Sequence, residues 1–451
     1  MIHKILIANR GEIAIRIIRA CREMGIETVA VYSEADKTAL HAQLADQAVC
    51  IGPAPAKDSY LNMEQIISAT MITGADAIHP GFGFLSENSR FAELCEACNI
   101  TFIGPDSRTI ENLGNKAHAR KTMMDAGVPV IPGSEEAVTE LPRGMEIAKE
   151  IGYPVIIKAV LGGGGKGMRV AYSENEFEHE FLTAQKEASQ AFGDSRMYLE
   201  HYIENPKHIE FQILADQHGN IIHLGERDCS IQRNHQKMIE EAPSTAVDEK
   251  LRKEMGNVAV RAAKAAGYTN AGTIEFLLED NRKYYFMEMN TRIQVEHTVT
   301  EWVTGIDLIK EQIRIADGQP LSYTQEQVKI EGHAIECRIN AEDPFQNFRP
   351  CPGTITDMYL PGGKGIRIDS AIYSGYTISP YYDSMMAKLI VWAKTRNEAI
   401  KKMHSALGEV IIEGVTTNID FLYEMMERKD YQKGNIKISY MDQVLKEMQE
   451  D

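Results

Sequence analysis

The residues with the clearest chemical potential lie on two neighbouring stretches in the second half of the chain. The stretches 273–277 and 284–290 alternate like strands and are joined by a polar turn, which predicts an antiparallel hairpin. Glu288 and Asn290 share one face, and a loop of about four residues sets Glu275 opposite Glu288. Facing carboxylates destabilise a sheet unless a cation lies between them. Oxygen-only ligands predict Mg²⁺ or Mn²⁺, with pairing of one Glu to Lys or Arg as the alternative.

The same polar face continues through the next residues. Fully extended, the chain from Glu288 to Glu296 spans roughly 26 Å at about 3.3 Å per residue, too long for one reaction centre, so we expect it to bend. Arg292 offers a planar fork for a carboxylate-like anion such as bicarbonate. Glu296 is a candidate general base if it reaches that anion. A structural salt bridge between the two is the alternative that spacing leaves open.

A glycine-rich loop is the second chemical signal. The strand-like run 153–159 comes before it and another, 168–171, comes after it, which predicts a hairpin. A Walker A loop would instead lead into a helix. The glycine N–H groups, with Lys158 and Lys166, suit phosphate oxygens. A flexible surface turn is the alternative.

Three polar or aromatic runs remain ambiguous. Alternation places His208, Glu210 and Gln212 on one polar face of a half-buried strand. The run 226–237 is too dense in functional groups for a typical core strand, and a charged surface loop is its alternative. The turn 79–84 is interpreted either as packing or as the wall of a ligand site.

Short apolar runs alternate with helical patterns up to about residue 114, which predicts a parallel sheet covered by helices. A dinucleotide site needs G-x-G-x-x-G after the first strand, and only Gly11 is present, so we expect a Rossmann-like scaffold without a nicotinamide or flavin. The connector 128–133 is rich in Pro and Gly and suits a hinge. The expected strands are 5–8, 28–31, 75–79 and 101–104. The expected helices are 61–72, 89–98 and 116–126.

The bulk composition limits the classes of function. The 451 residues are 43% hydrophobic and 25% charged, which predicts several folded units, and there is no membrane-length apolar run. A net charge of −17 argues against a nucleic-acid partner. The first residues run into a strand pattern without signal-peptide regions, and the seven cysteines are scattered. We therefore expect a cytoplasmic protein with reduced thiols.

Together these segments resemble the biotin carboxylase family of ATP-grasp enzymes. They span nearly the whole chain, in an ordered series far more specific than a glycine loop. The stretches that carry the resemblance are IANRGEIA, HPGFGFLSEN, FIGP, YPVIIKA, GGGGKGMRV, HIEFQI, LGERDCSIQRNHQK, EEAPS, AGTIEFL, FMEMNTRIQVEHTVTE, GHAIECRINAED and YYDSMMAKL.

The resemblance implies a multidomain fold of α/β and α+β type. The expected parts are a Rossmann-like domain over 1–114, an ATP-grasp domain over 115–330 with a mobile lid at about 131–203, and a C-terminal biotin carboxylase domain over 331–447. Two positions depart from the family pattern: Phe82 stands where Tyr is frequent, which removes a phenol hydroxyl from the biotin site, and His201 replaces a frequent Lys.

The resemblance also implies roles for individual residues. The expected ATP-binding residues are Lys116, Lys158, Gly164, Gly165, Glu200, His201, Ile203, His208, Gln232, His235, Glu275 and Glu288. The expected metal ligands are Glu275, Glu288 and Asn290. Bicarbonate would be held by Lys237, Arg292, Gln294 and Val295, and biotin would contact Arg338, Phe82 and Gly83. The catalytic residues would be Arg292, Glu296, Lys237 and Arg338.

The implied reaction uses ATP and Mg²⁺ or Mn²⁺ to carboxylate biotin with bicarbonate through carboxyphosphate. The chain carries no Ala-Met-Lys-Met biotinylation site, so biotin is expected on a carrier protein. The implied partners are that carrier and the carboxyltransferase subunits of an acetyl-CoA carboxylase, with the chain itself a homodimer. A pyruvate or propionyl-CoA carboxylase is the alternative assembly, because the final acceptor never touches this chain.

Two rival functions remain. A carbamoyl-phosphate synthase module or a purine-pathway carboxylase would share the lid and the metal carboxylates, but the TRIQVEH strip with Arg338 favours biotin. A silent regulatory protein would bind nucleotide only. The complete set of Lys, Arg and Glu residues at the site weighs against that second rival.

Overall fold

The computed structural model describes residues 1–160 and 167–450. The chain forms two compact units, and each is described by itself. The first unit contains Met1–Val128, Lys207–Phe276 and the chain from Glu288 onward, and the second contains Pro129–Pro206 and Leu277–Met287.

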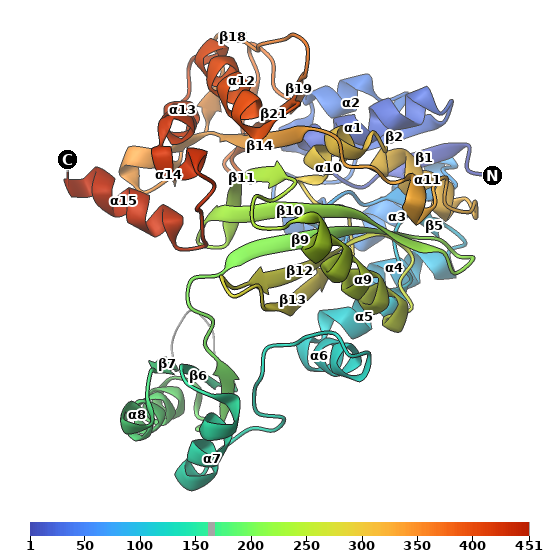
Figure 1. Ribbon diagram of the computed structural model, residues 1–451. Coiled ribbons are helices and arrows are strands. Elements are labelled where there is room, and N and C mark those ends of the chain that lie inside the picture. The colour runs from blue at the N-terminus through green and yellow to red at the C-terminus, as the bar shows by residue number, and fades with distance from the viewer. Residues whose placement is uncertain (161–166, 451) are drawn as a thin grey trace. The chain divides into compact units, whose positions relative to one another are not determined.

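The N-terminal part of the first unit is built on a parallel sheet with the strand order β3-β2-β1-β4-β5 (Figure 1). The apolar face of α1, with Ile13, Ile17 and Cys21, is buried, as the spacing predicts. Each neighbouring pair of strands in this sheet is parallel, so the predicted parallel sheet is confirmed. The strand β3 was not indicated by the sequence pattern. The strands are β1 (Lys4–Ile7), β2 (Glu27–Tyr32), β3 (Gln47–Cys50), β4 (Ala77–His79) and β5 (Thr101–Phe102). The helices are α1 (Gly11–Glu23), α2 (Leu40–Leu44), α3 (Met63–Thr73), α4 (Ser89–Ala97), α5 (Ser107–Gly114) and α6 (Lys116–Asp125).

A long sheet with the order β13-β12-β9-β10-β11-β14-β21-β19 carries the central and C-terminal parts. β12 and β13 are neighbours in it, which confirms the predicted hairpin. Helices α9 and α10 pack on β10. The strands are β9 (Lys207–Ala215), β10 (Ile221–Arg233), β11 (Gln236–Ala242), β12 (Asn270–Leu278), β13 (Tyr284–Asn290), β14 (His333–Asn340), β19 (Ile366–Ser370) and β21 (Met385–Ala393). The helices are α9 (Glu249–Ala265), α10 (His297–Thr304) and α11 (Leu308–Ala316).

The C-terminal segment adds helices and short strand pairs around an apolar core that includes Leu389, Met403 and Phe421. Short strands pair as β15 with β16, β17 with β20, and β18 with β22. The strands are β15 (Glu342–Asp343), β16 (Arg349–Pro350), β17 (Gly353–Thr354), β20 (Thr377–Ile378), β18 (Met358–Tyr359) and β22 (Ile411–Ile412). The helices are α12 (Arg396–Glu409), α13 (Ile419–Glu427), α14 (Lys429–Gln432) and α15 (Tyr440–Glu450).

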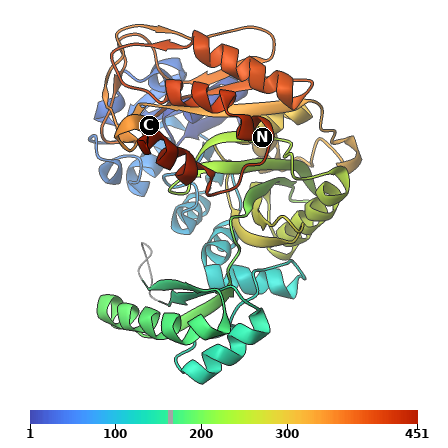
Figure 2. The ribbon, with the colours of Figure 1, turned by 60° about the vertical axis from the view of Figure 1, so that its left-hand side comes forward.

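The second unit is a small antiparallel sheet with the order β7-β6-β8, and α7 and α8 pack on it (Figure 2). Lys158 of β6 faces Met168 of β7 in the register, so the predicted strand–loop–strand hairpin is confirmed. Phe177 and Phe181 stack in its core. The elements are α7 (Leu141–Ile151), β6 (Val155–Ala159), β7 (Met168–Ala171), α8 (Glu174–Phe192) and β8 (Met197–His201).

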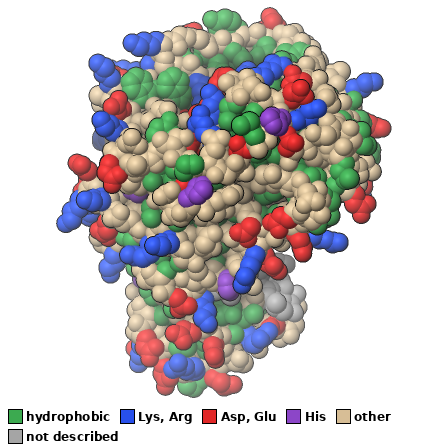
Figure 3. Space-filling model, turned by 90° about the vertical axis from the view of Figure 1, so that its right-hand side faces the viewer, with side chains coloured by type: hydrophobic (Ala, Val, Ile, Leu, Met, Phe, Trp, Pro, Cys, Tyr) green, Lys and Arg blue, Asp and Glu red, His purple; other side chains and the backbone are tan. Residues whose placement is uncertain are grey.

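The mixed α/β and α+β architecture matches the predicted fold class. The domain boundaries drawn from the sequence remain a prediction. The face in Figure 3 shows side chains of both charges intermixed. Within the described ranges, no helix combines the length and apolar character needed to cross a bilayer.

Candidate active site

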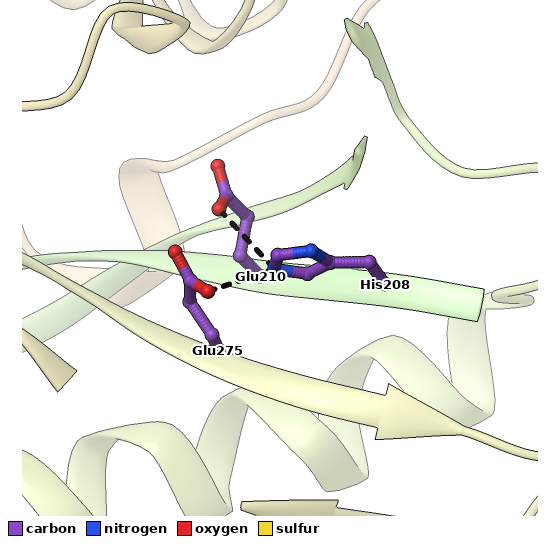
Figure 4. A group of neighbouring side chains, drawn as sticks. All are labelled: His208, Glu210 and Glu275. Carbon is purple, nitrogen blue, oxygen red and sulfur yellow. Dashed lines mark ion pairs between the residues drawn. The ribbon is translucent and has the colours of Figure 1, made fainter. Parts of the chain in front are cut away.

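A group of buried ionisable side chains lies at the centre of the long sheet (Figure 4). His208 and Glu210 come from β9 and Glu275 from the neighbouring strand β12. The His208 Nε2 atom is 2.9 Å from Glu275 Oε2 and 3.9 Å from Glu210 Oε2. Both faces of β9 are buried, so the expectation of a half-buried strand is wrong. The polar face of this strand points into the protein, where each charge needs a partner.

Arg227 is the largest fully buried side chain of the described chain, and it organises this cluster. Its guanidinium donates to Glu210 at 2.5 Å and to Gln294 at 2.6 Å. Gln212, Thr273 and Thr300 accept its remaining hydrogen bonds. Residues 226–233 of the run lie on the largely buried strand β10, where the doubt about a core strand is wrong, and the surface-loop alternative holds only for the exposed residues 234–236. Sequence reasoning missed Arg227 because a dense polar run usually lies in solvent.

The Lys237 ammonium lies among three carboxylates. Its Nζ is 2.6 Å from Glu210 Oε2, 3.1 Å from Glu275 Oε1 and 2.7 Å from Glu296 Oε1. Burial alone would raise the pKa values of these carboxyl groups, but Lys237 and neighbouring cations lower them, to about 2 for Glu296. Burial works against the charge of Lys237, and the surrounding carboxylates raise its pKa well above its usual value. Lys237 and these three carboxylates therefore stay charged at neutral pH.

The predicted metal ligands belong to the adjoining strands β12 and β13. Asn290 Nδ2 donates to Glu275 Oε1 at 2.7 Å. Loss of hydration and then the charge of Glu275 raise the pKa of Glu288, whereas Lys116 lowers it. The carboxylates of Glu275 and Glu288 and the amide oxygen of Asn290 offer oxygen ligands only, which is the donor chemistry that fits Mg²⁺. Their assignment as ligands, and the facing register of Glu275 and Glu288, remain predictions.

The chain bends at Thr291 and Arg292, directly after β13, as the length argument predicts. Residues 291–296 form neither strand nor helix. Arg292 donates to Glu87 Oε2 at 2.8 Å and to Asn290 Oδ1 at 3.1 Å. Glu296 pairs with Lys237 and with Arg338. Arg292 and Glu296 thus pair with different partners, which contradicts the alternative of a salt bridge between them.

Arg338 extends the cluster onto β14. It donates to Glu240 Oε1 at 2.6 Å and to Glu296 Oε2 at 3.1 Å. Glu240 of β11 stands directly opposite Glu336 in the sheet register. Sequence reasoning missed both Glu240 and Glu87, because they lie far along the chain from the residues they orient.

The predicted adenine-binding residues lie in the second unit. Lys158 pairs with Glu200 across β6 and β8. The His201 Nε2 atom is 3.8 Å from Glu279 Oε1, and Ile203 is buried. Gly164, Gly165 and Lys166 fall outside the described residues.

The remaining predicted contacts lie in the first unit. Gln232 Nε2 is 3.2 Å from His208 Nδ1, whereas Lys116 and His235 are exposed. Phe82 is partly buried against the core under the parallel sheet, and Gly83 adopts a φ of +68°. The loop therefore contributes to packing, and its contact with biotin remains a prediction.

Comparisons with known proteins agree with this arrangement. Family models match in order along the chain: biotin carboxylase N-terminal domain over 1–110, carbamoyl-phosphate synthase L chain ATP binding domain over 115–324, and biotin carboxylase C-terminal domain over 336–443. "Biotin carboxylase 1" of Bacillus subtilis is 59% identical, over 98% of both chains. A pyruvate carboxylase subunit of Methanothermobacter thermautotrophicus is 54% identical, over 98% of this chain and 90% of its own.

A solved structure extends the comparison to ligands. The biotin carboxylase domain dimer of Hydrogenobacter thermophilus 2-oxoglutarate carboxylase, in complex with MgADP, ADP and bicarbonate, superposes with a TM-score of 0.88 at 52% identity over 98% of each chain. The fold and site define an ATP-grasp ligase with three domains. The chain belongs to the biotin carboxylase family.

Proposed function

We propose that this chain uses ATP and Mg²⁺ to carboxylate biotin with bicarbonate. In this reaction a bicarbonate oxygen bonds to the γ-phosphorus, the bond to ADP breaks, and carboxyphosphate forms. Carboxyphosphate then gives CO₂ and phosphate, the phosphate takes the biotin N–H proton, and the nitrogen bonds to CO₂. The observation that carries the proposal is the junction at Glu296, where Lys237 and Arg338 meet one carboxylate.

The cluster provides cations where the reaction develops negative charge. Arg292, Gln294, Lys237 and the backbone of Val295 are proposed to hold bicarbonate, with Arg338 stabilising carboxyphosphate and the biotin enolate. Phosphoryl transfer depends mainly on position and charge neutralisation rather than covalent help. Because Arg227 and Glu210 hold the Lys237 and Gln294 side chains beforehand, little reorganisation is needed when the anions bind.

Glu296 is proposed as the base that removes the bicarbonate proton. With Lys237 and Arg338 beside it, its pKa of about 2 makes it a weak base. Bound anions would take up the positive charge of those two cations, and the pKa of Glu296 would then rise toward the value that a general base needs. The base is therefore activated only when the substrates are present.

Glu275, Glu288 and Asn290 would hold Mg²⁺, which would neutralise charge on the ATP phosphates. Lys116, Lys158, His208, Gln232 and His235, with Gly164 and Gly165, are proposed to contact the phosphates or ribose, and Glu200, His201 and Ile203 the adenine. Phe82 and Gly83 are proposed to border biotin. The oxygen donor chemistry of these side chains, with Glu275 buried and Glu288 exposed, supports the metal assignment.

The proposed partners are a biotin carboxyl carrier protein and carboxyltransferase subunits, in a cytoplasmic acetyl-CoA carboxylase. Homodimerisation is supported by the solved dimer of the similar biotin carboxylase domain. A pyruvate acceptor is a second candidate, because a relative named as part of a pyruvate carboxylase is 54% identical. Reconstitution with each purified carrier and carboxyltransferase would decide which acceptor is carboxylated.

Phosphate release from ATP by the purified chain, with Mg²⁺ and bicarbonate, tests the proposed reaction. We expect strong stimulation by free biotin or by biotinylated carrier. ATP binding without stimulation by either form would contradict the proposal. The Arg292→Ala variant should still bind ATP and should lose biotin carboxylation, because it removes the anion fork; unaltered turnover would exclude that role for Arg292.

A further inference from the structure

Two sequence segments that the proposed reaction leaves unexplained meet in the interior of the first unit. Glu12 opens α1, at the turn where a dinucleotide site would carry glycines, and Lys388 lies on β21. Both side chains are buried, and the Lys388 Nζ atom is 3.3 Å from Glu12 Oε1. This contact joins the N-terminal and C-terminal parts of the first unit.

A lysine is a costly side chain for this position. Lys388 is 0% exposed, and an ammonium loses its hydration there unless charged partners replace it. Burial lowers the pKa of Lys388, but Glu12, Glu336 and Asp369 raise it above the ordinary value, so the side chain stays charged. An apolar side chain of similar volume would fill the same space at lower cost. Packing alone therefore does not account for the charge.

The Lys388 ammonium has a second partner, the backbone carbonyl of Val295, at 2.7 Å. Val295 lies between Gln294, whose amide donates to Glu275, and Glu296, which accepts from Lys237. Residues 291–296 belong to no strand or helix. The position of this carbonyl therefore depends on a side chain and not on the ladder of a regular element.

A peptide bond is planar, so fixing the Val295 carbonyl also fixes the plane that leads to the Cα atom of Glu296. The direction of the Glu296 side chain depends on that plane. We propose that Lys388, held by Glu12, is a positioning residue for bicarbonate: it fixes the Val295–Glu296 peptide so that the base and the anion-binding groups face one point. This inference rests on the proposed function and deepens it.

A purely structural ion pair would affect stability without selecting a substrate. The proposed role instead predicts separate effects on the two substrates, because Val295 and Glu296 belong to the anion-binding segment and not to the nucleotide residues of the second unit. The measurements are therefore the KM for bicarbonate, the KM for ATP and kcat, determined from biotin-dependent phosphate release. The thermal midpoint reports the structural cost alone.

Lys388→Met removes the donor while keeping a side chain of similar length. A hydrogen bond from a charged group is strong enough to raise the KM for bicarbonate, or lower kcat at saturating ATP, by about tenfold or more. The KM for ATP should stay within about twofold of the wild type. Arg396→Met is the matched control, because Arg396 is also largely buried and pairs with Glu241 at 2.6 Å, away from the anion-binding segment. It should lower the thermal midpoint and leave all three kinetic values near those of the wild type.

Glu12→Gln is a milder second variant that decides the question if Lys388→Met does not fold. It removes the carboxylate that holds Lys388 and should raise the KM for bicarbonate in the same selective way, by a smaller factor. An unchanged bicarbonate KM and kcat in the folded variants, or an equal rise in both KM values, would overturn the inference. Failure of the wild type to show biotin-dependent phosphate release would overturn the proposed function first, so the two failures are distinguishable.

Discussion

The proposed base Glu296 of the first unit and the proposed nucleotide contact Lys158 of the second unit are held in different ways. In the first unit, Glu210 and Glu296 are buried and the Lys237 side chain is 12% exposed, and each touches more than one charged partner. In the second unit, Lys158 and Glu200 form a pair whose side chains are 36% and 27% exposed. A buried network of paired charges is oriented before substrate arrives, whereas a half-exposed pair is screened and can rearrange. The difference separates the proposed base Glu296 and its partners from the proposed nucleotide contact Lys158.

The largest expected effect of a substitution is on turnover in the first unit. Glu296→Gln keeps the size of the side chain and removes the proposed base, so biotin-dependent phosphate release should fall by about 10²- to 10⁴-fold. Steady-state kinetics at saturating ATP and bicarbonate measures this. Glu241→Gln is the control, since Glu241 is a buried carboxylate paired with His333 and Arg396 rather than with the site. A similar loss in both variants would show a general structural effect.

The next expected effect is on stability. Arg227→Met leaves the buried Glu210 carboxylate without its guanidinium, and breaking a buried ion pair in this way costs about 3–5 kcal/mol of unfolding free energy. In the second unit, Arg143 and Glu146 form an exposed pair, so Arg143→Met should cost about 0–1 kcal/mol. Urea unfolding of both variants measures the contrast. Equal costs would contradict the distinction between the two units.

A smaller, more selective effect is expected from the half-exposed pair. Lys158→Met should raise the KM for ATP by about tenfold, through loss of one charge-assisted contact, and should cost less than about 1 kcal/mol in stability. The KM for bicarbonate should be unchanged. Lys149→Met, which removes another exposed lysine paired with Glu174, should leave both KM values near those of the wild type. An unaltered KM for ATP in Lys158→Met would remove that lysine from the nucleotide site.

The smallest expected effect concerns pH. Burial lowers the pKa of His41, in the first unit, from 6.5 to about 4. The folded state therefore binds fewer protons than the unfolded state between these values, so the stability contributed by neutral His41 is complete above pH 6.5 and is lost as the pH falls toward 4. His41→Gln should reduce the loss of stability between pH 7 and pH 5.5 by about 1 kcal/mol. Urea unfolding at the two pH values measures it, and an identical pH dependence in both proteins would contradict the assignment.

The strand patterns that carry the site were readable because alternation is a local property of the sequence. The β12–β13 hairpin, the bend after Asn290 and the hairpin that begins at β6 follow from period-two spacing and chain length. Arg227 could not be recognised in the same way, since its burial depends on Glu210 and Gln294, which come from other segments. A signal was available in the strict alternation around Glu210, because a polar face buried in a sheet requires a buried cation. Glu87 and Glu240 gave no local signal.

Transfer of labelled bicarbonate to biotin tests the central claim most directly. The purified chain, ATP, Mg²⁺ and isotopically labelled bicarbonate would be incubated with free biotin and, separately, with biotinylated carrier. We expect label on biotin that depends on ATP, and loss of that label in Glu296→Gln while ATP still binds. Cleavage of ATP without label on either form of biotin would contradict the account, because the buried cluster would then serve a different acceptor.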